Sequence, residues 1–257
     1  MGYGLDFGWL VEGAAGIARG AAMTLLLIVV TTLIGTVLSI LGAAGRRSRH
    51  RWLRDAIAAY VEVVRNTPFL VQLFFIFFGL PTLGVRLDPI IAAILAMTLN
   101  MAAYTTEIVG AGLDAVPRGQ REAALALGLS PRQVFVKIVL PQAMMVIYPP
   151  LTSQIVIMML ESAVVSQIAV RELTYEADML QARTFRAFET YLVVTLVYLC
   201  LSFWSLLQGL LKVSTGMSSC TLEFASAAAH IPLASLAIFL SPASHSRSIL
   251  PASSNTQ

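Results

Sequence analysis

The chain has 257 residues, of which 57% are hydrophobic and only 12% are charged, and its mean hydropathy is +0.78. Soluble domains carry about 25% charged residues, so this composition excludes an ordinary water-soluble enzyme and indicates a protein of the lipid bilayer. The net charge of +3 is small, and we expect no nucleic acid among the partners.

The first 20 residues contain Asp6 and Glu12 but no basic residue before Arg19. A cleaved signal peptide begins with a positively charged segment. We therefore expect residues 1–20 to form an extracytoplasmic N-terminal segment and the first apolar helix to remain in the protein.

A bilayer core about 30 Å thick needs roughly 20 apolar residues for each helical crossing. The sequence offers such segments at residues 21–44, 56–80, 89–113, 140–170 and 191–211. This pattern predicts an all-α, polytopic transmembrane domain of about five spans within residues 21–212. It leaves no room for a separate soluble catalytic domain.

Basic residues are concentrated in the first and third loops between these spans. The first loop holds Arg46, Arg47, Arg49, Arg51 and Arg54, and the third holds Arg118, Arg121, Arg132 and Lys137. The second loop has only Arg86, and in the fourth loop three arginines are outnumbered by four acids. Because short loops rich in Lys and Arg stay in the cytoplasm, we expect an external N-terminus and cytoplasmic first and third loops.

The third loop, within residues 115–141, has the pattern of a helical hairpin. Pro117 suits the first turn of a helix, and Gly128 supplies the left-handed residue that ends it. Ser130 is a good N-cap, Pro131 suits the next position, and Gln133 completes a capping box. Two short helices should therefore meet at the corner "GLSP". We expect Leu125, Leu129, Val134 and Ile138 to pack this corner and the four basic residues to stay in water.

The same loop contains a longer motif. It consists of Glu122, Ala123, Ala124, Gly128, Ile138, Leu140 and Pro141, and it resembles the EAA motif of ABC importer permeases. The stretches "YVEVVRNTPFLVQLFFIFFGLP", "LNMAAYTTEI", "PPLTSQIV" and "VRELT" followed by "ARTFRAFE" resemble the polar amino-acid branch of that family. The resemblance covers about residues 20–212.

The resemblance implies a type I importer permease of the MetI-like architecture in the bacterial inner membrane. It implies a second permease chain, identical or related, an extracytoplasmic solute-binding protein and a pair of cytoplasmic ATPases that dock on the hairpins. Small side chains at Ala123 and Ala124 would allow close approach of the ATPase, and Gly128 would hold the corner. The implied substrate is a polar amino acid or a relative such as an opine.

The chain contains no G-x-x-x-x-G-K-[ST] phosphate-binding loop. ATP hydrolysis is therefore expected in a partner, and we expect a transport subunit without a cofactor rather than an enzyme. Two rivals remain. A secondary transporter would need no ATPase but should show internal repeats or ion-coupling groups, and a membrane enzyme would need a convergent catalytic set.

Three polar residues lie deep in the predicted spans. Asn100 and Gln154 fall near the middle of the third and fourth spans, and Glu161 lies two helical turns beyond Gln154 on the same face. Intramembrane polar groups usually face a cavity or a partner. These side chains therefore face the substrate pathway, or they satisfy one another and the backbone that Pro149 and Pro150 release at a break in the fourth span.

Glu161 departs from the family pattern, in which an acid here often follows a lysine, because Leu160 precedes it. Its carboxylate would suit the α-ammonium of an amino acid or a cationic side chain. Glu62 and Arg65 have the spacing of an ion pair on one helix, for which a structural role is expected. Residues 213–257 do not fit the family; we expect a poorly ordered tail, with a short sixth span at 224–240 as the alternative. The histidines and the two cysteines are scattered and indicate no metal site.

Overall fold

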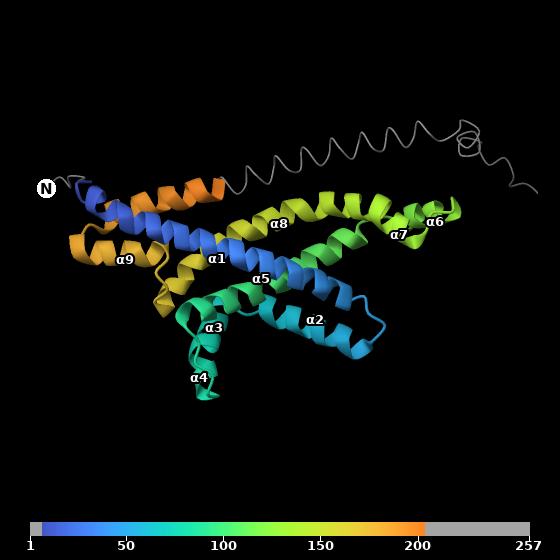
Figure 1. Cartoon of the computed structure of the whole chain (residues 1–257), viewed down its shortest axis with the longest axis horizontal. Coiled ribbons are helices and arrows are strands. Elements are labelled where there is room, and N and C mark those ends of the chain that lie inside the picture. Colours follow the sequence, from blue (N-terminus) through green and yellow to red (C-terminus); the bar gives the residue numbers. More distant parts are fainter. Residues whose placement is uncertain (1–6, 204–257) are drawn as a thin grey trace, which may run out of the picture. The chain divides into compact units, whose positions relative to one another are not determined.

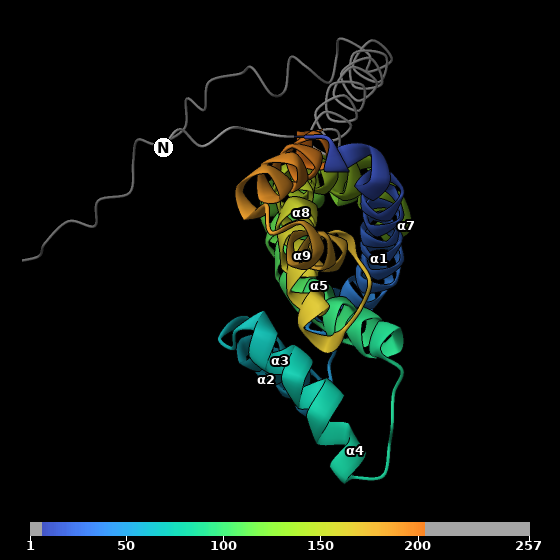
Figure 2. The same ribbon diagram turned by 90° about the vertical axis from the view of Figure 1, so that its left-hand side faces the viewer.

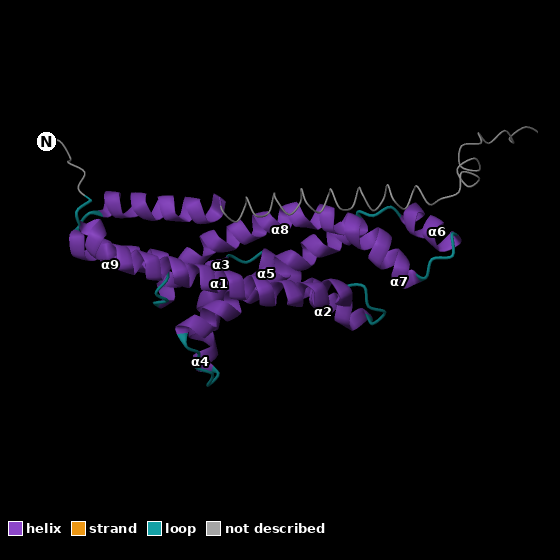
Figure 3. Cartoon of the chain, turned by 45° about the horizontal axis from the view of Figure 1, so that its top comes forward, coloured by secondary structure: helices purple, strands orange, loops and turns teal. Residues whose placement is uncertain are grey.

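The computed structural model describes residues 7–203, and Figure 1 shows them as helices joined by short connections. The elements are α1 (Trp9–Gly45), α2 (Arg51–Arg65), α3 (Phe69–Phe74), the π-helix η1 (Phe75–Gly79), α4 (Leu80–Thr82), α5 (Pro89–Asp114), α6 (Arg118–Ala126), α7 (Pro131–Val134), the π-helix η2 (Phe135–Val139), α8 (Leu140–Ser162), the 3-10 helix η3 (Ala163–Ile168) and α9 (Leu173–Thr184). A further apolar helix, Ala187–Phe203, follows. Within the described part of the chain there is no strand, as Figure 3 shows. The all-α prediction is therefore confirmed.

Three of the described helices are long and apolar enough to cross a membrane. They are Glu12–Gly45, Pro89–Asp114 and Pro131–Ile168. The bent pair α2 and α3–α4 makes a fourth candidate, and Ala187–Phe203 covers the part of the predicted fifth span that is described. The rest of that span and the predicted tail lie outside the described residues.

The core of the domain is the contact of α5 with α1 and α8. In Figure 2, α2 to α4 lie on one side of the group formed by α1, α5, α8 and α9. Two glycines allow α1 to approach α5 closely. A Cβ on Gly35 would come within 2.8 Å of the Met101 side chain, and one on Gly42 would come within 2.6 Å of the Thr106 hydroxyl. Small residues at such contacts are how membrane helices gain close packing.

The predicted second span, residues 56–80, is not one continuous helix. Its direction changes by 109° between α2 and the helical segment that begins at Phe69. The cause is Pro68, which has no N–H to donate and disfavours a helical conformation for the residue before it. The single span expected from hydropathy is thus corrected to a broken one.

Side chains bind backbone carbonyls on the α2 side of this break. Asn66 Nδ2 and Thr67 Oγ1 each donate to carbonyls one turn back in α2, at 2.9 and 2.7 Å. Gln72 Nε2 donates to the carbonyls of Val64 and Thr67, both at 2.8 Å. The bend is therefore held by hydrogen bonds from polar side chains to the backbone.

The start of the fourth span also differs from the prediction. Helix α8 continues through Pro149 and Pro150, although they were expected to break it. Thr152 Oγ1 donates to the carbonyl of Tyr148 at 3.0 Å, and Ser153 Oγ donates to that of Pro149 at 3.3 Å. Hydroxyl groups beside the two prolines thus bind carbonyls of the preceding turn.

A buried glutamate joins α9 to two other helices. The side chain of Glu172 has no exposed surface and forms the N-cap of α9, accepting from Tyr175 N at 2.8 Å. Its other oxygen accepts from Tyr198 Oη at 2.9 Å and from Thr24 Oγ1 at 3.3 Å. Burial raises the pKa of Glu172, and these hydrogen bonds partly oppose the rise. One carboxyl group therefore ties α9 to α1 and to the helix Ala187–Phe203.

The hairpin corner has the predicted local structure. Gly128 is in the left-handed region at φ +83°. Ser130 N donates to Gln133 Oε1 at 2.9 Å, and Gln133 N donates to Ser130 Oγ at 3.4 Å, which confirms the capping box. Pro117 lies one residue earlier than expected, at the N-cap of α6.

Packing at the corner differs in two respects from the prediction. Val134 is buried, and Leu129 and Ile138 pack against the same cluster, but Leu125 is 47% exposed. The buried residue of α6 is Ala124 instead. Arg121 was expected to stay in water, yet it is half-buried and donates to the carbonyl of Leu113 at 2.9 Å.

Replacing Glu172 with Gln should change how stability depends on pH. A carboxyl whose native pKa lies above its unfolded value, about 4.3 for Glu, binds protons more tightly in the folded state. Its contribution to the free energy of unfolding therefore falls as pH rises from that value through the raised native pKa. Thermal unfolding should show that the wild type loses more stability than Glu172→Gln when the pH is raised from 5 to 8. Glu12→Gln, at an exposed glutamate, is the control, and a difference that does not vary with pH would contradict the prediction.

Replacing Gly128 with Ala should loosen the hairpin. A Cβ at this positive φ costs about 1 kcal/mol, which corresponds to roughly fivefold faster local opening. Hydrogen exchange of the amides in residues 118–139 would measure it. Gly119→Ala is the control, because Gly119 lies within α6 with nothing within 4 Å of the added Cβ; it should slow exchange or leave it unchanged. Faster exchange in both variants would point to a cause other than the backbone conformation.

Candidate functional site

The motif residues of the hairpin divide into an outer and an inner set. Glu122, Ala123 and Gly128 are exposed. Ala124 is only 3% exposed and packs with Val134 in the hairpin core. The remaining members, Ile138, Leu140 and Pro141, lie at the start of the long helix that continues into α8, where Leu140 is exposed and the other two are half-buried.

The outer face of the hairpin combines an apolar tip with charges. Leu127 is 77% exposed and Leu125 is 47% exposed. Glu122, Arg118 and Arg132 are exposed on the same hairpin. In Figure 1, α6 and α7 lie at the end of the domain where the loop between α1 and α2 also lies. An exposed apolar centre with a polar rim is the anatomy of a protein–protein interface.

Asn100, the first predicted pathway residue, is buried on α5. Its Nδ2 donates to Oε1 of Gln72 at 3.3 Å, so it contacts the side chain that holds the bend before α3. Its Oδ1 has no hydrogen-bond partner among the described residues. Gln72 was not recognised from the sequence as part of this site. The signal that could have found it is Pro68, because a proline-broken span needs polar side chains to satisfy its backbone.

Gln154 and Glu161, the other two predicted pathway residues, also have unpaired atoms. Gln154 Nε2 and Glu161 Oε2 are buried and make no hydrogen bond within the described part of the chain. Asn100, Gln154 and Glu161 therefore do not satisfy one another's hydrogen bonds, which was one of the two roles expected for them. Buried polar atoms without partners are rare in proteins and require an explanation.

The ion pair predicted between Glu62 and Arg65 is not formed. Arg65 instead lies 3.6 Å from the carboxylate of Glu107 on α5, which also binds Arg46 at the end of α1. Glu62 accepts a hydrogen bond from Asn66 at 3.0 Å. The prediction considered only pairs within one helix, whereas the partner of Arg65 comes from a neighbouring helix.

The described residues offer no group of three or more His, Cys, Asp or Glu side chains that could hold a metal ion. Cys200 is exposed on the last described helix. Cys220, His230 and His245 lie outside the described residues. The candidate site thus consists of the hairpin surface and the unpaired polar atoms of Asn100 on α5 and of Gln154 and Glu161 on α8.

Comparison with known proteins identifies the family. Residues 35–212 match the family described as "Binding-protein-dependent transport system inner membrane component". The arginine transport system permease protein ArtQ of Bacillus subtilis is 35% identical over 198 residues, which cover 76% of this chain and 89% of that protein. The glutamine transport system permease protein GlnP of Escherichia coli is 35% identical over 187 residues, which cover 72% and 85%. The L-cystine transport system permease protein TcyB of B. subtilis is 36% identical over 167 residues, covering 65% and 71%.

Solved structures of ABC transporters are also similar to this chain. A crystal structure of an amino acid ABC transporter with histidines is similar with a TM-score of 0.78 and 32% identity, over 83% of this chain and all of that one. The MetNI methionine ABC transporter, at 22% identity and a TM-score of 0.64 over 83% of this chain and 99% of that one, shares the fold. This chain therefore belongs to the family of binding-protein-dependent transport system inner membrane components, and it is a multi-pass permease subunit of an ABC importer rather than an enzyme.

Proposed function

We propose that this chain forms the translocation pathway for a polar amino acid and that its hairpin transmits the movement of an ATPase to that pathway. The substrate class is supported by relatives named for arginine, glutamine and L-cystine and by a similar transporter solved with histidines. The observation that carries the proposal is the exposed hairpin surface around Glu122, Ala123 and Gly128.

The partners in this proposal are a pair of cytoplasmic ATPases, an extracytoplasmic solute-binding protein and a second permease chain. The hairpin lies in the cytoplasm, and the N-terminus lies outside, as the distribution of basic residues supports. The ATPase contacts the outer set of motif residues. Ala123 allows its close approach, whereas Ala124 is buried and acts by packing the hairpin.

A rigid hairpin suits this role. The corner is fixed by a left-handed glycine and a capping box, and buried contacts join α6 to α7. Residues Pro131–Ile168 form one helical segment, which begins in the hairpin and is long and apolar enough to cross a membrane. A push on the hairpin would therefore move this helix and change which side of the membrane the pathway faces.

Within the membrane, Asn100, Gln154 and Glu161 are the proposed substrate contacts. Each has a buried atom without a partner among the described residues, which supports a role in binding a polar molecule. The carboxyl group of Glu161 suits the ammonium group that all amino acids share, or a cationic side chain. A secondary transporter would leave the capped hairpin without a function.

Replacing Gly128 with Asp should uncouple transport from the ATPase. The change adds a side chain and a negative charge at the exposed corner. Affinity purification in mild detergent, followed by mass spectrometry, should recover a stoichiometric P-loop ATPase with the wild type. The variant should lose that ATPase or its substrate-stimulated hydrolysis, and uptake should fall more than about tenfold, the cost of roughly 1.4 kcal/mol.

Gly84→Asp is the matched control for this experiment. Gly84 has φ +86° and nothing within 4 Å, like Gly128, but lies between α4 and α5. It should keep the ATPase and uptake. Absence of an ATPase from the wild-type preparation would overturn the importer mechanism in favour of a secondary transporter.

Replacing Glu161 with Gln should weaken substrate binding while leaving the complex intact. A hydrogen bond to a charged group contributes about 1.5–3 kcal/mol, so the KM for uptake should rise roughly 10- to 100-fold. Uptake of labelled arginine, histidine, glutamine and cystine by proteoliposomes would measure this and name the substrate. Glu62→Gln, at an exposed glutamate on α2, is the control. An unchanged KM in Glu161→Gln, with the ATPase still bound, would remove Glu161 from the pathway.

A further inference from the structure

The arginines in and beside the loop between α1 and α2 differ in whether they form ion pairs. Arg46 binds Glu107, and Arg47 lies 2.7 Å from the carboxylate of Asp114 and donates to the carbonyl of Gly110 at 3.0 Å. These two arginines join the end of α1 to α5. The loop therefore uses part of its positive charge internally.

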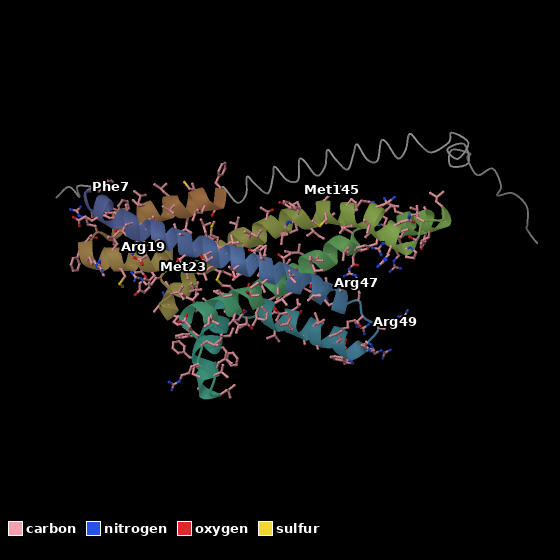
Figure 4. All side chains as sticks on the ribbon, viewed as in Figure 1. Phe7, Arg19, Met23, Arg47, Arg49 and Met145 are labelled. Carbon is pink, nitrogen blue, oxygen red and sulfur yellow. The ribbon has the colours of Figure 1, made fainter. Side chains whose placement is uncertain are left out.

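The remaining arginines of the loop face outward. Arg49 and Arg51 are exposed, and neither has a carboxylate within ion-pair distance among the residues described here. Figure 4 shows Arg49 at the tip of the loop. Asp55, one turn after Arg51, lies 3.5 Å from Arg54 instead. Arg49 and Arg51 thus form an exposed positive surface at the start of α2.

An apolar stripe begins directly beside this charge. Trp52 is 71% exposed, and Ala56, Ala59 and Val63 are exposed at helical spacing after it. Val61, on a different face of α2, is buried, and α2 packs against α5. The stripe is thus an outward face of α2. Leu41, near the end of α1, is exposed as well, so apolar surface leads to the charged loop on both helices.

This juxtaposition has the chemistry of a bilayer boundary. Tryptophan is enriched where the hydrocarbon core meets the headgroups, because its ring is apolar and its N–H is polar. Guanidinium groups bind phosphate oxygens in a fork, two hydrogen bonds at a time. Basic residues close to a membrane surface strengthen binding to anionic lipid, by roughly fivefold each.

We propose that Arg49, Arg51 and Trp52 form a binding site for the headgroup of an anionic phospholipid. The two guanidinium groups bind the phosphodiester and the negative charge of the lipid. The indole lies at the hydrocarbon boundary, and the lipid chains lie along the stripe of α2. An acidic surface of a partner protein would match the arginines, but it would leave the apolar stripe without lipid contact.

Tryptophan fluorescence tests this site directly. The chain has three tryptophans, so Trp9→Phe with Trp204→Phe leaves Trp52 as the only reporter. The full-length protein is reconstituted in phosphatidylcholine bilayers that contain either brominated phosphatidylglycerol or brominated phosphatidylcholine. At low salt, the relative binding constant from quenching should favour phosphatidylglycerol about tenfold or more. At about 1 M salt, where the Debye length is about 3 Å, the preference should largely disappear.

The deciding variant is Arg49→Gln with Arg51→Gln, which should reduce the preference to near onefold while brominated phosphatidylcholine still quenches Trp52. The matched control is Arg86→Gln with Arg183→Gln, which removes the same charge from exposed arginines elsewhere in the chain and should keep the preference. Equal quenching by the two lipids in the unsubstituted loop would overturn the proposal, as would a preference that survives Arg49→Gln with Arg51→Gln. Protection of Trp52 from both lipids, in the isolated chain or in the complex with its ATPase, would also overturn it and assign the surface to a protein.

Discussion

The structure depends on one constraint, the need to satisfy every backbone N–H and C=O group where no water is available. Helices meet this need by themselves, and the candidate spans in the described part of the chain are helical except at Asn66–Pro68. Where Pro68 breaks a span, the side chains of Thr67 and Gln72 bind carbonyls that lack their usual helical partners. Gln72 also binds Asn100, so the side chain that satisfies backbone groups at the bend also positions a polar group of the proposed pathway.

Two carboxylates join neighbouring helices in this domain. Glu172 joins α9 to α1 and to the helix Ala187–Phe203 through two hydroxyl groups and one N–H. Glu107 joins α5 to the end of α1 and to α2. Buried or half-buried carboxylates of this kind fix the register of neighbouring helices, because an unpaired charge in such surroundings is costly. Asn100, Gln154 and Glu161 differ from these carboxylates, because each keeps a buried polar atom without a partner among the described residues.

The hairpin shows how one short motif meets two requirements. Its inner residues, such as Ala124 and Val134, are small or branched and fill the core between α6 and α7. Its outer residues, Glu122 and Ala123, stay exposed, where the proposed ATPase would contact them. Because successive residues of an α-helix differ by about 100° in direction, the consecutive motif residues of α6 point in different directions. The motif therefore contains both buried residues that pack the hairpin and exposed residues.

The sequence by itself determined the all-α class, the apolar segments and the hairpin corner, because these depend on composition, period and local capping. Gly128, Ser130 and Gln133 could be assigned because their partners lie within a few residues. Only the tertiary structure decided the 109° bend, the burial of Ala124 in place of Leu125, and the pairing of Asn100 with Gln72 and of Arg65 with Glu107. Spacing along one helix shows which residues share a face, but it does not show which face of another helix they meet. That depends on how the helices pack, and here the glycines of α1 allow its close approach to α5.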